Sequence, residues 1–432
     1  MHRTYARCIH YIFHLPIVIR SNFAAVDQPK KIAFVCHPYH RGGVTRWMAD
    51  AAIAAADAGH GAYFVTVDPT NPFQSGAGRE KMVDLLPGTK DNLTVISTKV
   101  SFEFEFGTME YRTWVYKKLI ALLPAGTPLI LSDDTAVWNA AAELQSSYFI
   151  VGVLHADEPY YYRLAEKYHS RTDAFVCVSE RIKKEVIRLL PGFSASAVYT
   201  IPCGIQLPQF HGTTASDNIL KLIYVGRVSS YQKRVGDLLK TCLALDKLHS
   251  DFHLLIVGDG DAKTQLANDF NQNALARKVT FSGWVPQLEV ASYLAAADIL
   301  LLTSDFEGTP IAMMEALSNG CAVVGTRVSG LEDYEFHPRA NDCISLFSVG
   351  DVEDAARKII KISRAPRINR RSAARALAES AFSMAACLAA YYKIGDRGKS
   401  FIPPNKIKIP VLDLFYSRAL ALARWAKVKL IK

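Results

Sequence analysis

Residues 299–317 read ILLLTSDFEGTPIAMMEAL, which predicts a strand, a loop and the start of a helix. The apolar residues Ile299–Leu302 suit a buried strand, and Pro310 suits the first helical position with Thr309 as the N-cap. A helix that starts beyond a strand end presents free N–H groups and the positive end of its dipole there. The segment therefore predicts an anion site at one edge of a sheet.

Two carboxylates belong to this segment. Glu307 lies in the loop before the helix and Glu315 lies inside the helix. A carboxylate accepts two hydrogen bonds, which suits the neighbouring hydroxyls of a ribose or hexose. The alternative interpretation is an ordinary capped helix with solvated acids.

The same alternation of strand and helix continues in both directions from this segment. Strands are expected at Ile32–Cys36, Ala62–Val67, Thr94–Ile96, Pro128–Leu131, Tyr148–Leu154, Ala174–Val178 and Val198–Ile201, and then at Leu222–Val225, Phe252–Val257, Val279–Phe281, Ile299–Leu302 and Ala322–Val324. Such alternation predicts parallel sheets covered on both faces. A segment rich in Pro, Gly, Thr and Ser, residues 202–218, separates the two series. We therefore expect two doubly wound domains, with a large ligand in the cleft between them.

The overall composition is globular, but the charge is uneven. Hydrophobic residues make up 50% of the 432 residues and charged residues 21%, which excludes a disordered, collagen-like or coiled-coil chain. No run of 18 apolar residues predicts a spanning helix. Residues 397–432 hold nine Lys or Arg and one acid, so 9 − 1 = +8 of the net charge of +9 lies in this tail. Its Trp-containing part, residues 411–432, is interpreted as a basic amphipathic helix on anionic lipid or as a helix packed on the body.

The cysteines indicate neither a metal site nor a disulfide framework, and the N-terminus is only faintly similar to a signal peptide. The eight cysteines show no CxxC pair and no zinc spacing, so we interpret them as thiols of a reducing compartment and expect no metal. Residues 1–30 have the faint outline of a signal peptide, but His10, His14 and Pro16 interrupt its apolar run. We interpret residues 1–30 as a poorly ordered leader before a first strand near Lys31.

Two further loops carry residues suited to phosphate. Gly226 and Arg227 follow one strand, with Lys233 a few residues later, and they offer close backbone approach and cationic donors. Gly42 and Gly43 open the first helix, where a ligand can come close. The alternative interpretation of the loop that carries Arg227 and Lys233 is a solvated basic loop without a ligand. Gly258-Asp259-Gly260-Asp261 is better explained as a turn than as a dinucleotide or metal motif. Asp133-Asp134, at the end of another strand, is explained equally well as a helix cap.

Together these segments resemble the retaining, family-4-type glycosyltransferases of the GT-B fold. The matching pieces follow the family order over about residues 31–395 and are Gly42–Val44, Val176–Glu180, Ile201–Ile205, Val225–Arg227, Lys233–Val235, Ile256–Gly260, Val279–Gly283 and the pair Glu307 and Glu315, separated by seven residues. Cys203 stands where the family more often has Asn, a difference from which we expect no effect.

The resemblance implies the roles of the site residues. Arg227 and Lys233, beside Gly226, would bind the donor diphosphate, and Glu315 would hold the ribose. Glu307 and the backbone amides of the segment after it would face the transferred sugar; that segment is Gly308, Thr309, Pro310 and Ile311. Trp284 and Val285 would lie near the nucleobase. From the first domain, Gly42 and Gly43 would lie under the diphosphate and His155 near the reacting sugar. A catalytic His usually needs a positioned partner, so His155 is alternatively a structural residue at a strand end.

The expected architecture is therefore an α/β GT-B fold of two Rossmann-like domains facing across a cleft, with a basic amphipathic C-terminal tail. The expected parts are a leader (1–30), an acceptor-side domain (31–205), a nucleotide-sugar-binding domain (206–382), a crossover helix that packs back on the first domain (383–396) and the tail (397–432).

The expected activity is retaining transfer of a hexose-type sugar from a nucleoside-diphosphate sugar to a glycan or lipid-linked acceptor, without metal or cofactor. The setting implied by the family is polysaccharide or lipopolysaccharide synthesis in the cytoplasm, at the inner face of a membrane that residues 411–432 contact. No nucleic-acid partner is expected. The alternatives are an inactive membrane-associated scaffold of the same fold, a sugar-nucleotide epimerase or a phosphorylase. A dehydrogenase is disfavoured because the G-x-G-x-x-G fingerprint and its ribose-binding acid are missing.

Overall fold

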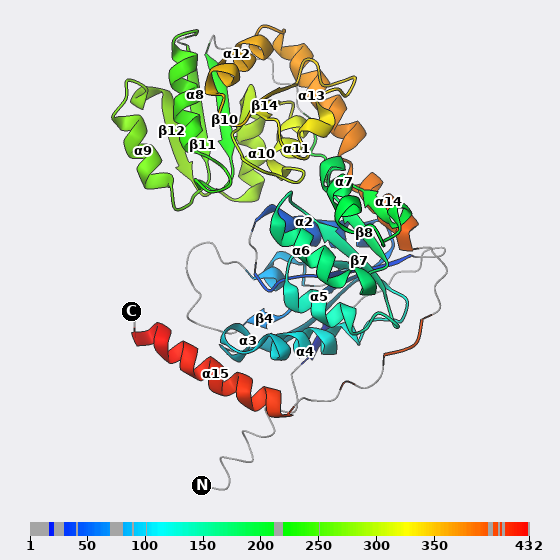
Figure 1. The fold of residues 1–432 in the computed structure, drawn as a ribbon. Helices are drawn as coiled ribbons and strands as arrows, with labels where there is room; N and C mark the ends of the chain where they lie inside the picture. The colour runs from blue at the N-terminus through cyan, green and yellow to red at the C-terminus, as the bar shows by residue number, and fades with distance from the viewer. Residues whose placement is uncertain are drawn as a thin grey trace.

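A computed structural model describes residues 17–20, 30–39, 42–69, 81–88, 90–100, 102–210, 219–249, 251–395, 401–404, 407 and 411–430. The chain forms two α/β domains, with the first below the second in Figure 1. Each domain has a mainly parallel sheet with helices on both faces, and the strands in the middle of each sheet are almost wholly buried. The expected architecture of two doubly wound α/β domains is thus confirmed.

The first sheet has the strand order β1-β5-β3-β2-β6-β7-β8-β9, with β4 paired to β5. Its strands are β1 (Ile17–Arg20), β2 (Lys31–Val35), β3 (Gly61–Val65), β4 (Asp68–Pro69), β5 (Leu93–Val100), β6 (Pro128–Leu131), β7 (Phe149–Leu154), β8 (Ala174–Cys177) and β9 (Val198–Thr200). The order of the sheet changes direction between β2 and β6, and ligands of such sheets bind at the carboxyl ends of the strands at this point.

The strand β1 corrects the expectation of a poorly ordered leader that extends to residue 30. Residues 17–20 pair antiparallel with β5, from Ile17 opposite Thr98 to Arg20 opposite Val95. Three of these four residues are β-branched, which favours an extended strand at a sheet edge. The rest of the expected leader lies outside the described residues.

The second sheet has the strand order β12-β11-β10-β13-β14-β15, and all its neighbours are parallel. Its strands are β10 (Leu220–Val225), β11 (Phe252–Val257), β12 (Val279–Gly283), β13 (Ile299–Leu302), β14 (Ala322–Thr326) and β15 (Ile344–Phe347). This order has its switch point between β10 and β13. The loops after these two strands carry Arg227, Lys233 and Glu307, so the sheet topology alone brings these residues together.

The helices cover the faces of the two sheets. They are α2 (Gly43–Asp57), α3 (Phe102–Phe106), α4 (Met109–Ile120), α5 (Thr135–Ala142), α6 (Pro159–Tyr168) and α7 (Glu180–Leu189) in the first domain, and α8 (Gly236–Asp246), α9 (Lys263–Asn271), α10 (Gln287–Ala296), α11 (Ile311–Ser318), α12 (Val352–Ser363) and α13 (Arg367–Ala381) in the second. No helix among the described residues is both long and apolar enough to cross a membrane.

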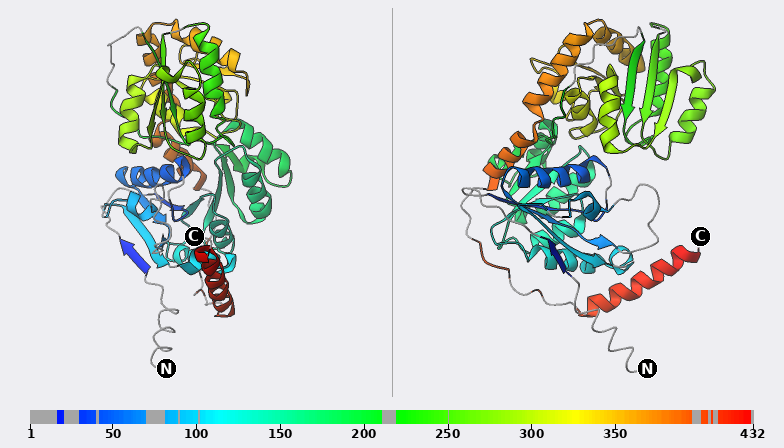
Figure 2. Two further views of the ribbon diagram at one scale, coloured as in Figure 1. Left: turned by 90° about the vertical axis from the view of Figure 1, so that its left-hand side faces the viewer. Right: turned by 180° about the vertical axis from the view of Figure 1, so that it is seen from behind.

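The last two helices return to the first domain. Helix α14 (Met384–Gly395) packs on α2, where the ring of Tyr391 lies 6.1 Å from that of Trp47. Gly204 permits the start of α14 to pack against the loop after β9, because a Cβ there would lie 2.7 Å from the Cα of Met384. Helix α15 (Val411–Leu430) lies against α3 and α4, on the side of the first domain that faces away from the second domain (Figures 1 and 2).

Candidate active site

The N-terminus of α2 faces the second domain. Gly42 precedes this helix with a φ of 134°, a conformation that side chains rarely permit. Gly43 follows, and a Cβ there would lie 2.7 Å from Cγ1 of Ile311 in the second domain. The missing side chain of Gly43 therefore allows the start of α2 to touch the start of α11 across the domain boundary, and Gly42 permits the backbone conformation that precedes the helix.

Helix α11 begins one residue later than expected and is not capped by Thr309. Pro310 is its N-cap, without a side-chain hydrogen bond, and Ile311 is the first helical residue. The Thr309 hydroxyl instead donates across the domain boundary to the carbonyl of Val178, at 2.5 Å. The first amides of α11 consequently remain directed toward the pocket that Ile311 and Ala312 line.

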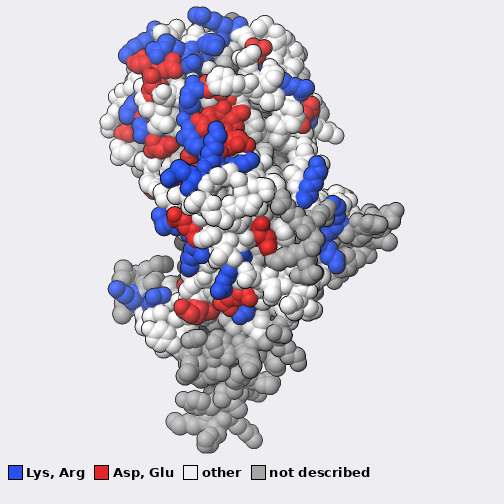
Figure 3. Space-filling model, turned by 45° about the vertical axis from the view of Figure 1, so that its right-hand side comes forward, with Lys and Arg blue, Asp and Glu red and all other residues white. Residues whose placement is uncertain are grey.

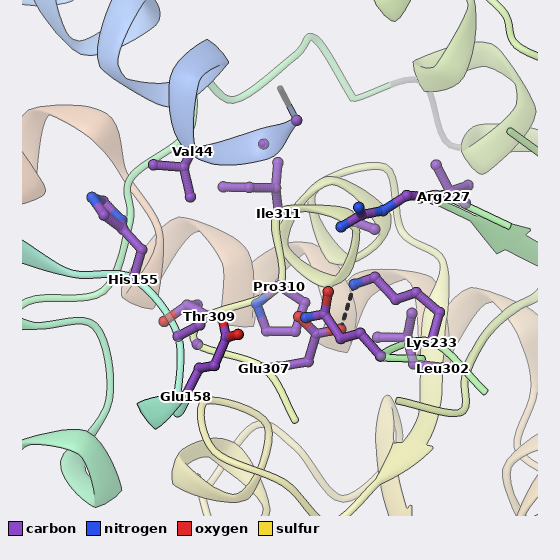
Figure 4. Close-up of a pocket in the computed structure, with 18 of the residues that line it drawn as sticks. Val44, His155, Glu158, Arg227, Lys233, Leu302, Glu307, Thr309, Pro310 and Ile311 are labelled. Carbon is purple, nitrogen blue, oxygen red and sulfur yellow. Dashed lines mark hydrogen bonds and ion pairs between the residues drawn. The ribbon is translucent and has the colours of Figure 1, made fainter. Parts of the chain in front are cut away.

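These two helix N-termini meet at a pocket of about 450 Å³, a size suited to a small-molecule ligand (Figure 4). Both domains contribute to its lining. The residues are Gly42, Gly43, Val44, Thr45, Asp133, His155, Ala156, Glu158 and Tyr161 from the first domain, and Tyr224, Val225, Gly226, Arg227, Gln232, Lys233, Leu302, Glu307, Gly308, Thr309, Pro310, Ile311 and Ala312 from the second.

Two cations lie on the second-domain side of the pocket (Figure 4). The Lys233 ammonium donates to Oε1 of Glu307 at 2.6 Å, and the Ser304 hydroxyl donates to the same oxygen at 2.6 Å. Both side chains of this ion pair are largely buried, with exposed fractions of 19% for Lys233 and 8% for Glu307. Arg227 is exposed, and no carboxylate of the described residues lies within ion-pair distance of its guanidinium. The pocket thus combines two helix dipoles and two cations, the arrangement that a diphosphate requires.

His155 lies on the opposite side, at the end of β7, and is buried. Burial lowers the pKa of its imidazole to about 3, so the ring is neutral near pH 7. Its Nδ1 lies 3.9 Å from the thiol of Cys203, and its ring packs edge-on against Trp47 at 5.4 Å between centroids. A neutral ring can orient a sugar hydroxyl but carries no charge to stabilise an anion.

The domains are in direct contact around the pocket. The amide of Asp157 donates to the carbonyl of Glu307 at 3.0 Å, and the hydroxyls of Ser179 and Ser329 lie 2.6 Å apart. Arg181 forms a two-point ion pair with Glu332 in the second domain. The structure is therefore a closed one, in which groups of both domains can contact one ligand.

Three residues expected at the site lie outside this pocket lining. Glu315 is on α11 and partly buried. Trp284 and Val285 follow β12, two strands away from β10, and the Trp284 side chain is 68% exposed. They lie at the same carboxyl edge of the sheet as Gly226. The other expected site residues come together in the pocket.

The pocket also contains polar residues to which the sequence assigned no ligand role. Asp133 follows β6, and Glu158 and Tyr161 lie after β7, at the switch-point edge of the first sheet. The position of Asp133 directly after a buried strand was the sequence signal that could have placed it at the site. The cap interpretation of this pair holds for its neighbour Asp134, the N-cap of α5, which accepts a hydrogen bond from the Ala136 amide at 2.7 Å. Gln232 donates to the carbonyl of Phe306 and so joins the loop after β10 to the loop after β13.

The remaining patterns have structural explanations. A Cβ at Gly258 would lie 1.9 Å from the carbonyl of Gly226, so this glycine permits two loops to pack. Asp259 binds Lys263 and the Gly260 amide within its own turn, as expected.

The seven cysteines of the described segments, from Cys36 to Cys387, are free and buried, whereas Cys8 lies outside those segments. Nowhere in the described part of the chain do three or more His, Cys, Asp or Glu side chains form a group that could hold a metal ion.

Comparison with known proteins gives two family matches. Residues 41–208 match the Glycosyltransferase Family 4 model, and residues 220–364 match the Glycosyl transferases group 1 model. One subunit of phosphatidylinositol N-acetylglucosaminyltransferase from Arabidopsis thaliana is 28% identical over 51% of this chain and 47% of its own length. The amylovoran biosynthesis glycosyltransferase AmsK from Erwinia amylovora is 32% identical over 34% of this chain and 36% of its own. The chain thus spans less than half the length of these relatives.

Solved structures show the same fold at low sequence identity. A mutant of S. aureus TarM, in complex with UDP, fondaparinux and α-GlcNAc-glycerol, superimposes with a TM-score of 0.67 at 13% identity, covering 85% of this chain and 100% of the chain in that structure. Anabaena Alr3699/HepE, in complex with UDP and glucose, gives 0.63 at 16% identity over 84% of this chain and 98% of its own. With both domains matched by family models and the fold shared, the chain belongs to the glycosyltransferases of the GT-B fold.

Proposed function

We propose that this protein transfers a hexose-type sugar from a nucleoside-diphosphate sugar to a glycan or lipid-linked acceptor, with retention of anomeric configuration. The observation that carries the proposal is the convergence of two helix N-termini with Arg227 and Lys233 in one pocket between the domains. This convergence suits a diphosphate, whereas Glu307 and Glu158 offer carboxylate oxygens to hydroxyls. The relatives named for amylovoran and phosphatidylinositol glycosylation support a role in polysaccharide or glycolipid synthesis.

The pocket supports a mechanism in which charge on the leaving group is stabilised. The bond between the anomeric carbon and the diphosphate oxygen breaks, and negative charge develops on the diphosphate. Lys233, Arg227 and the amides at the start of α11 stabilise that charge. The acceptor hydroxyl attacks from the same face, and its proton passes to the leaving phosphate oxygen. We propose this front-face route because the cations lie on the leaving-group side, whereas Glu307 is already bound by Lys233 and Ser304.

We further propose that transfer needs neither a metal ion nor another cofactor, because the two cations and the two helix N-termini can supply the charge stabilisation. The proposed location is the cytoplasmic, inner face of a membrane, which suits the free buried thiols. Contact with an anionic lipid surface through residues 411–432 is part of this proposal.

Thermal unfolding with UDP, GDP, ADP and TDP, each with and without a chelator, tests the donor site first. A nucleotide at 100 times its Kd stabilises the protein by ~2.7 kcal/mol. We expect one nucleotide to raise the Tm and the chelator to leave that rise unchanged. If no nucleotide raises the Tm of folded protein, the inactive-scaffold alternative replaces the proposal. Release of nucleoside diphosphate that requires an acceptor would exclude an epimerase.

Substitution of the two cations provides the decisive test of the site. Lys233→Ala and Arg227→Ala each remove a charge-assisted hydrogen bond, so we expect the diphosphate to bind roughly 10- to 100-fold more weakly. Turnover should fall by ~10²–10³-fold, because the lost interaction strengthens as the leaving group gains charge. Arg277→Ala, at an exposed basic residue of the second domain, is the matched control and should bind normally. Unchanged binding and turnover in both pocket variants would refute the site assignment.

A further inference from the structure

Three described side chains attach helix α15 to the first domain. Ser417 and Ala421, one helical turn apart, are both fully buried. The Thr108 amide donates to the Ser417 hydroxyl at 2.9 Å, and the Arg424 guanidinium donates to the carbonyls of Phe106 and Gly107. Among the described side chains, the contact is thus made by the short Ser417 and Ala421 and by the Arg424 guanidinium.

Two large apolar side chains of this helix point the other way, whereas Leu420 is half-buried. Tyr416 is 67% exposed and Leu422 is 47% exposed. Ala419, Ala423 and Ala426 are exposed with them. We call these five residues the outer face of α15. A surface helix in water normally turns its large apolar side chains to the protein core, so the exposed Tyr416 and Leu422 depart from that arrangement.

The charge on the helix itself has one dominant sign. Residues 411–430 contain four Lys or Arg and a single acid, Asp413. Lys427 is exposed beside the outer face. The second domain differs, because basic and acidic side chains lie next to one another on the face drawn in Figure 3. An exposed apolar face with basic surroundings is complementary to anionic lipid headgroups above an acyl layer.

We propose that the outer face of α15 docks on an anionic lipid bilayer. Because Ser417 and Arg424 fix the helix to the first domain, docking places that domain against the bilayer and the second domain away from it (Figures 1 and 2). The acceptor-side part of the pocket then belongs to the domain nearest the membrane. The proposal deepens the membrane contact in the proposed function, but it does not depend on the donor chemistry.

Co-sedimentation of the full chain with vesicles tests this surface. Vesicles of phosphatidylcholine alone are compared with vesicles that also contain phosphatidylglycerol, at low and high salt. We expect binding only to the anionic vesicles and release by salt. The double variant Tyr416→Ser/Leu422→Ser should bind roughly tenfold more weakly or worse, because two apolar side chains no longer leave water. Lys427→Ala should bind about fivefold more weakly.

The substituted residues are exposed, so the variants leave the attachment of α15 intact. Phe336→Ser and Lys361→Ala are matched controls at exposed residues of the second domain and should bind as the wild type does. Wild-type protein that stays in the supernatant with anionic vesicles overturns the proposal. Equal binding by the wild type and all α15 variants also overturns it. A dimer in lipid-free solution that the Tyr416→Ser/Leu422→Ser variant dissociates would show instead that the outer face is an interface between two copies of the chain. Nucleotide binding, measured on the same variants, reports separately on the donor site.

Discussion

At the scale of single residues, Gly308 shows how one missing Cβ can set the approach of two domains. It lies between Glu307 and the start of α11, and a Cβ there would lie 1.9 Å from the carbonyl of His155 in the first domain. The same Cβ would lie 2.7 Å from Cγ2 of Val178. No side chain fits between these atoms unless the domains separate.

Gly308→Ala should therefore fold normally but fail to close. A shift of about 1 Å in the position of reacting groups can reduce the rate roughly 10²-fold, and we expect a loss of that order. Turnover and the radius of gyration from solution scattering check this together. Gly192→Ala is the control, because Gly192 is exposed and has no atom near its Cβ position. Full activity in Gly308→Ala would show that the closed contact is dispensable.

His155 makes a separate prediction for acid stability. Its folded-state pKa of about 3 lies below the ordinary value of 6.5, so on acidification the unfolded chain binds a proton that the folded protein does not. Stability therefore falls as the pH drops from about 6.5 toward 3, and this residue contributes a loss of about 2 kcal/mol between about pH 7 and pH 5. Urea unfolding at both pH values measures this: the free energy of unfolding of His155→Gln should fall by less than that of the wild type, by the amount that His155 contributes. An identical loss in variant and wild type would contradict it.

At the scale of elements, the long alternating pattern predicted most strands because buried parallel strands are short apolar runs between turn residues. It missed β15, Ile344–Phe347, which is only four residues long and is the edge strand of its sheet. It also missed α6, Pro159–Tyr168, whose three consecutive tyrosines obscure helical periodicity. Burial within the tertiary fold decides such segments, so local sequence alone could not identify them.

The start of α11 illustrates a different limit. Thr309 has the side chain of a good N-cap, but its hydroxyl is bound to Val178 of the other domain, and Pro310 occupies the cap position. A local rule could not include a partner 131 residues away in the sequence. For the same reason the sequence left α15 with two interpretations. The structure shows the packed arrangement for Ser417 and leaves Tyr416 exposed on the same helix.

At the scale of the whole molecule, the site is divided between two sheets, and each half lies at its own switch point. The sequence identified Gly42, Gly43 and Gly226, both cations and Glu307, because each lies in the loop that follows a recognisable strand. It did not assign Asp133 or Glu158 to the pocket, because only the juxtaposition of the domains shows which strand ends face each other. Contacts around the pocket, including Arg181 with Glu332, then hold the domains together.

We expect this ion pair to favour the closed arrangement. Arg181→Glu should weaken nucleotide binding about two- to fivefold, the effect of an exposed ion pair, because closure then opposes two like charges. The exchange variant Arg181→Glu/Glu332→Arg should restore affinity. Titration calorimetry of both variants measures this. Equal affinity in the single variant and the wild type would show that closure does not depend on the pair.

The return of the last two helices to the first domain has a consequence for how the protein is made. Trp47 is covered by Tyr391 of α14, and Ser417 of α15 receives the amide of Thr108. At about 5–20 residues per second, a ribosome needs roughly 10–40 s to proceed from the end of the first domain to α14. During that interval the nascent first domain has its sheet but lacks its outer cover, so its apolar surface is open to chaperones. A chain released before α14 would expose that surface permanently and become a substrate for proteases.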